Sequence, residues 1–74
     1  MYIIQEIQTT KGVTTLLPAE TRMDRNEADS VFYMKISYAA SSAIDVHTII
    51  MFDEHGNIIE QKFYEHHNDS LENI

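Results

Sequence analysis

"RNEADSVFYMKISYAASSA", residues 25–43, is the longest stretch of the chain with a helical pattern. It follows Asp24, a favourable N-cap residue, and Glu27 stands three positions later as in a capping box. The stretch contains no Gly or Pro, so we expect one helix that runs to about Ser42. With about 100° between successive residues, one stripe of this helix is suited to lie on a sheet, and it consists of Ala28, Phe32, Ile36, Ala39 and Ala43.

The segments on either side of this helix alternate with the two-residue period of strands. Residues 2–9 and 13–17 form a first pair around a turn at Gly12, and Pro18 ends the second strand near Leu17. Residues 46–52 and 58–65 form a second pair around the loop DEHGN. This order predicts an α+β fold, ββαββ, with one helix packed on a face of a four-stranded antiparallel sheet. We expect a single domain over residues 1–65 and a polar, mobile C-terminal tail over residues 66–74.

The composition restricts the functions that are open to the chain. With 74 residues it forms one thin core, because a domain of this size buries only about 60% of the surface of its unfolded chain. A net charge of −7 repels phosphate groups, so we expect no direct nucleic-acid binding. Cysteine is absent and no apolar run approaches the length of a membrane span. We therefore expect a cytoplasmic protein without membrane contact. Oligomerisation could support its thin core.

The helix and the third predicted strand carry more apolar side chains than one buried face requires. A second flank of the helix contains Val31, Met34 and Tyr38. In the strand, one face consists of Val46, Thr48, Ile50 and Phe52, and the other of His47, Ile49 and Met51. A shift of one residue exchanges these faces, so the pattern leaves open which of them the helix covers.

Two explanations of this excess are open. The helix flank could fold over the edge of the sheet or lie under the connection between residues 15 and 23. Alternatively, the flank or the uncovered sheet face packs against a second molecule, and the protein is a homo-oligomer, in its simplest form a homodimer. For the second explanation the expected self-association residues are Val31, Met34, Tyr38, Ile49 and Met51.

No residue pattern predicts catalysis. The acid pairs Asp24–Glu27 and Asp53–Glu54 are explained by a helix cap and a turn, and both glycines are used in turns. His66 and His67 are adjacent, and neighbouring side chains on an extended chain point apart, which does not suit a zinc site. We therefore expect no enzymatic activity, no cofactor and no metal ion.

Four segments together resemble a family of small proteins encoded by bacteriophages and prophages of Firmicutes. These segments are MYIIQEIQT at residues 1–9, DRNEADSVFY at 24–33, AASSA at 39–43 and VH at 46–47. The resemblance spans most of residues 1–66, and the family is uncharacterised. It implies a viral accessory protein in the host bacterial cytoplasm, and it supplies no catalytic residue.

The function that we expect is binding. In the first hypothesis the protein is a homo-oligomeric interaction module, an inhibitor of host defence, whose acids engage a host or phage protein with a basic surface. The acids expected to do so are Asp29, Asp53, Glu54 and Glu60. In the second hypothesis it sequesters a small ligand such as a nucleotide in a pocket that contains Tyr33, Tyr38 and His47. A structural or assembly protein of the virion is a third alternative.

Overall fold

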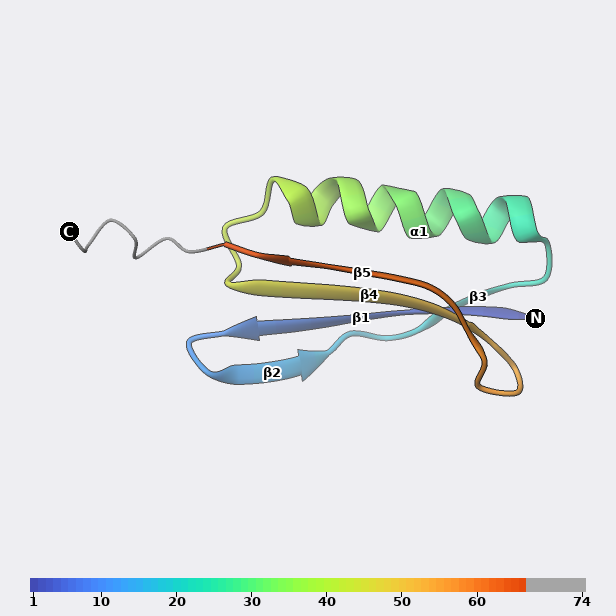
Figure 1. The fold of residues 1–74 in the computed structure, drawn as a ribbon, viewed down its shortest axis with the longest axis horizontal. Coiled ribbons are helices and arrows are strands. Elements are labelled where there is room, and N and C mark those ends of the chain that lie inside the picture. The colour runs from blue at the N-terminus through green and yellow to red at the C-terminus, as the bar shows by residue number, and fades with distance from the viewer. Residues whose placement is uncertain (67–74) are drawn as a thin grey trace.

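The computed structural model describes residues 1–66 and contains five strands and one helix. Along the chain these are β1 (Tyr2–Thr10), β2 (Val13–Leu16), β3 (Glu20–Arg22), α1 (Arg25–Ala40), β4 (Val46–Asp53) and β5 (Ile58–Glu65). The strands form one antiparallel sheet in the order β2-β1-β4-β5, and β3 pairs with the first half of β1 beyond the end of β2. Figure 1 shows α1 along one side of this sheet and no element on the opposite side. The predicted α+β fold with ββαββ order is confirmed.

The strand β3 was not predicted, because its three residues are too short for an alternation to be recognised. Pro18 interrupts the path between β2 and β3, as expected of a residue that cannot donate to a ladder. The chain then returns to the same edge of β1, where Ile3 faces Thr21 and Tyr2 faces Arg22. The connection between residues 15 and 23 therefore extends the sheet and does not cover the helix.

Local sequence explains both hairpins. Lys11 and Gly12 have φ angles of 51° and 81°, the two positive values that a tight type I′ turn between twisted strands requires. In the β4–β5 loop, the Asp53 carboxylate accepts the backbone N–H groups of His55 and Asn57, at 2.9 Å each. Gly56 takes a φ of 85° there, which its missing side chain permits.

The helix begins where the cap predicts and ends slightly earlier than expected. The Asp24 carboxylate accepts the backbone N–H of Glu27 at 3.1 Å. Ser41 leaves the helical conformation, and its N–H bonds to the Tyr38 carbonyl at 3.2 Å. Ala43 therefore lies beyond the helix and is exposed, so it is not part of the stripe that faces the sheet.

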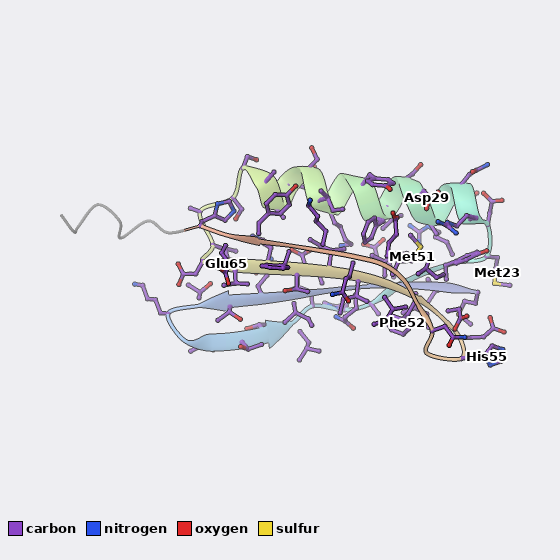
Figure 2. The ribbon with its side chains drawn as sticks, viewed as in Figure 1. Met23, Asp29, Met51, Phe52, His55 and Glu65 are labelled. Atoms are coloured by element: carbon purple, nitrogen blue, oxygen red, sulfur yellow. The ribbon has the colours of Figure 1, made fainter. Side chains whose placement is uncertain are left out.

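The core is a single layer between α1 and one face of the sheet. The strands contribute Ile4, Ile49 and Met51, and the helix contributes Ala28, Val31, Phe32 and Ala39. Partly buried side chains close its margins, namely Tyr2, Ile36, Ile59 and Tyr64. Figure 2 shows the consequence on β4, where Met51 lies toward the helix and its neighbour Phe52 lies away from it.

The folded unit extends one residue past the predicted boundary at residue 65. The His66 N–H bonds to the Asp45 carbonyl at 2.8 Å, and its ring Nε2–H donates to the Ala39 carbonyl at the end of α1, also at 2.8 Å. The rest of the predicted tail, residues 67–74, lies outside the described residues. Within residues 1–66, α1 does not have the length and apolar character needed to cross a membrane.

Candidate functional site

Three of the residues expected to mediate self-association are in the core. Val31, Ile49 and Met51 are buried between the helix and the sheet, so they cannot form an exposed contact surface. The reason is that α1 covers the β4 face that carries His47, Ile49 and Met51, one of the two faces that the sequence pattern left open. Val31 belongs to the buried helix stripe and does not lie on a free flank.

The other two members of that set, Met34 and Tyr38, are exposed one turn apart on α1. Tyr33 is also exposed, and its hydroxyl group donates to the Glu60 carboxylate at 3.1 Å. The expected ligand pocket of Tyr33, Tyr38 and His47 is not formed, because Tyr38 is 70% exposed on the helix whereas His47 is 3% exposed beneath it. The prediction of this pocket was wrong because it did not account for the burial of His47.

The open face of the sheet, opposite α1, gathers apolar side chains from β1, β2, β4 and β5. None of its strand residues is buried, and Leu16 and Phe63 are 66% and 58% exposed. The register places these side chains on it: Ile3, Gln5, Ile7, Thr9, Thr14, Leu16, Thr21, Val46, Thr48, Ile50, Phe52, Ile58, Gln61, Phe63 and Glu65. We call this set the open face.

The open face is almost free of charge. Among the strand residues that the structure describes on it, Glu65, at the end of β5, is the single ionisable one. The whole chain nevertheless has a net charge of −7. A sheet face that remains in water normally alternates apolar inward residues with polar and charged outward ones. The open face instead combines aliphatic and aromatic side chains with uncharged Thr and Gln.

The four acids expected to meet a basic partner each have a partner within the chain. Asp29 pairs with Arg25 at 2.9 Å, one helical turn away. The backbone N–H of Asn57 is the main cause that lowers the pKa of Asp53, and the hydrogen bond from the Met1 ammonium group lowers the pKa of Glu54. Glu60 accepts the Tyr33 hydroxyl, and this bond raises the pKa of Tyr33. Glu54 is exposed and the other three acids are half-buried, and each of the four is held by a partner within the chain.

A buried polar network under α1 was not predicted from the sequence. The His47 Nδ1–H donates to the Glu6 carboxylate at 2.8 Å, and Gln8 donates to the same oxygen at 3.2 Å. Lys35 reaches down from the helix to Glu6 at 3.8 Å and to Glu20 of β3 at 3.0 Å. The one available signal was the alternation of β1, which places Glu6 on the same face as the core residue Ile4.

This network connects the helix to three strands and is mostly satisfied. The hydrogen bond from Lys35 is the main cause that lowers the pKa of Glu20. Among the buried side-chain atoms of residues 1–66, the His47 Nε2 atom has no hydrogen-bond partner. No group of three or more His, Cys, Asp or Glu side chains in that range is arranged to hold a metal ion. We therefore interpret the network as a structural connection between α1 and the sheet.

Comparisons with protein-family models, with curated proteins and with solved structures found no match to this chain.

Proposed function

We propose that the protein acts by binding and that it self-associates through the open face. The observation that supports this proposal most directly is the nearly uncharged, apolar character of a sheet face that no helix or strand within residues 1–66 covers, in an acidic chain. Exposed apolar patches of this kind on small proteins mark interaction sites. Sheets with such faces pack against each other at about 10 Å, with side chains interdigitating between them.

A second copy of the chain is the occupant that the charges favour. Two molecules of net charge −7 repel each other over most of their surfaces. The open face is the large surface on which two copies can meet without bringing acids together, because its one ionisable residue lies at its end. A two-fold axis through this face would give a sandwich of two sheets with a helix on each outer side.

Light scattering on matched charge variants tests this proposal. Ile50→Glu places a charge at the centre of the open face, and Met34→Glu/Tyr38→Glu places charges on the exposed helix flank. We expect the wild type to have a multiple of the 8.6 kDa monomer mass, Ile50→Glu to lose this association, and the helix variant to retain it. Leu16→Glu, at a 66% exposed position of the same face, repeats the test without risk to the core.

Two results would contradict the proposal. A wild type that remains monomeric at about 100 μM would exclude self-association of the usual micromolar strength. Dissociation of the helix variant, with Ile50→Glu and Leu16→Glu unaffected, would instead assign the contact to the Met34–Tyr38 flank. Circular dichroism of each variant shows whether it is folded.

We further propose that the assembled protein presents its acids to a basic surface on a host or phage protein. The support is that Asp29, Asp53, Glu54 and Glu60 all lie outside the open face, so association through that face does not cover them. The resemblance to phage-encoded accessory proteins suggests a role against host defence. Replacing all four acids by Lys should slow capture of such a protein from infected-cell lysate and flatten its salt dependence, whereas equal capture by this variant would exclude the electrostatic mechanism.

A further inference from the structure

We infer that a second copy also pairs with the outer edge of β5, in an antiparallel register centred on Gln61. This contact is separate from the open face, because it joins two sheets edge to edge and leaves their faces as they are. It would give one continuous sheet through two molecules, with both helices on the same side.

The β5 strand is a long unprotected edge. Within residues 1–66 its strand neighbour is β4, and the buried residues of α1 pack with Ile4, Ile49 and Met51 of β1 and β4. It has eight residues and contains no proline. The neighbouring bulge lies between Met51 and Phe52, near the start of β5, so the segment from Glu60 onward pairs regularly with β4. Long regular edges of this type are templates for another strand.

The hydrogen-bond phase of the β4–β5 ladder shows which backbone groups point outward. The His66 N–H bonds to the Asp45 carbonyl, so the pair Val46–Glu65 inside this bond is of the non-hydrogen-bonded type. By alternation, Tyr64, Lys62 and Glu60 exchange hydrogen bonds with β4. Gln61 and Phe63 then direct their N–H and C=O groups toward the outer edge.

The charges on this strand select one symmetric register. A two-fold axis at Gln61 makes the two Gln61 residues a hydrogen-bonded pair and places Glu60 opposite Lys62 of the other copy, twice. Glu60 and Lys62 then form non-hydrogen-bonded pairs, in which side chains approach most closely. An axis at Glu60 would oppose two acids, and an axis at Lys62 would oppose two lysines, so both neighbouring registers are disfavoured.

Charged residues on an edge strand usually prevent pairing, but here the two charges have opposite signs and complementary positions. Both side chains lie on the helix side of the sheet, where the Tyr33 hydroxyl holds the Glu60 carboxylate. The Lys62 ammonium group lies 5.7 Å from the centre of the Tyr64 ring. The edge therefore offers a second copy an already oriented acid and base.

A charge-swap experiment tests this inference by light scattering and sedimentation equilibrium. We expect Glu60→Lys and Lys62→Glu each to raise the dimer dissociation constant of this contact about tenfold, because each converts two attractive pairs into repulsive ones. The double variant Glu60→Lys/Lys62→Glu should restore wild-type association. An equimolar mixture of the two single variants should also associate, since each supplies the charges that the other needs. The single variants change the net charge in opposite directions, so a general charge effect cannot imitate this pattern.

The same measurements separate this edge contact from the open-face contact. If both contacts exist and their two-fold axes close, the wild type is a tetramer at concentrations above both dissociation constants. At a concentration between the wild-type dissociation constant of the edge contact and the tenfold raised one, Ile50→Glu and Glu60→Lys are each mainly dimers, and the combined variant is mainly a monomer. A monomeric Ile50→Glu would overturn the edge contact and leave the proposed function standing. If the wild type is a dimer that Glu60→Lys dissociates and Ile50→Glu does not, the edge contact stands and the open-face contact of the proposed function is overturned. Single variants that associate like wild type, or a double variant that does not recover, would also overturn the inference.

Discussion

The two faces of the sheet differ in a way that is opposite to simple expectation. The face under α1 carries ionisable residues, of which Glu6 and His47 are buried, Glu20 and Glu60 are half-buried and Lys62 is exposed. The open face is accessible yet has one ionisable residue, Glu65, among its described strand positions. Hydrophobicity alone therefore did not decide which face α1 covers.

The polar groups of the covered face are accommodated because they pair with each other. Burying a charge is costly unless it is paired, and Glu6 is paired with Lys35 of the helix and with His47 of β4, whose Nε2 atom remains without a partner. The open face has a single ionisable residue among its described strand positions, Glu65 at the end of β5, and so loses less when it is dehydrated. This difference is what a face adapted to a second molecule would show.

The largest effect is expected when an aromatic ring is removed from the core under α1, and the matched variant removes a ring from the open face. Phe32→Ala, at a position that is 2% exposed, should cost about 3–5 kcal/mol of unfolding free energy and leave much of the protein unfolded. Phe63→Ala on the open face should change the stability of the monomer far less and mainly weaken self-association. Urea unfolding at several protein concentrations measures both effects. Equal losses at low concentration would show that the open face is part of the monomer core.

A smaller effect is expected from the polar network. Glu6→Ala should cost about 1–3 kcal/mol, because it leaves the His47 Nδ1–H buried without an acceptor. Thr48→Ala, next to His47 but on the open face, is the matched control and should cost less. Urea unfolding of both variants provides the comparison. A Glu6→Ala variant as stable as wild type would show that the network contributes nothing to the attachment of α1.

The smallest change in the free energy of unfolding is expected when the pH is lowered. The pKa of Glu20 is lowered by Lys35, so the unfolded chain binds this proton more readily than the folded one. The contribution of the Lys35–Glu20 pair to the free energy of unfolding is complete at pH values above 4.5, the ordinary pKa of this carboxyl group. It is lost as the pH falls through the lowered pKa of Glu20. Between about pH 5 and pH 3, the Glu20→Gln variant should therefore lose less of its unfolding free energy than the wild type does. An unchanged pH dependence in chemical unfolding would exclude a contribution from the Lys35–Glu20 pair.

Much of the fold could be predicted because it depends on neighbours in sequence. The turn at Lys11 and Gly12, the cap from Asp24 to Glu27 and the alternation of β1 and β4 all involve residues a few positions apart. The candidate sites were predicted less well. Val31, Ile49 and Met51 were assigned to a contact surface and lie in the core.

The sequence by itself determined four of the five described strands, the helix, the order of these elements and the excess of apolar residues on both sides of β4. The tertiary structure alone decided which side α1 covers, and with it the burial of Glu6 and the exposure of the open face. The physical reason is that this choice depends on pairs far apart in sequence, such as Glu6 with His47, 41 positions away, and Tyr33 with Glu60, 27 positions away. Their contacts exist only after the sheet and the helix have come together.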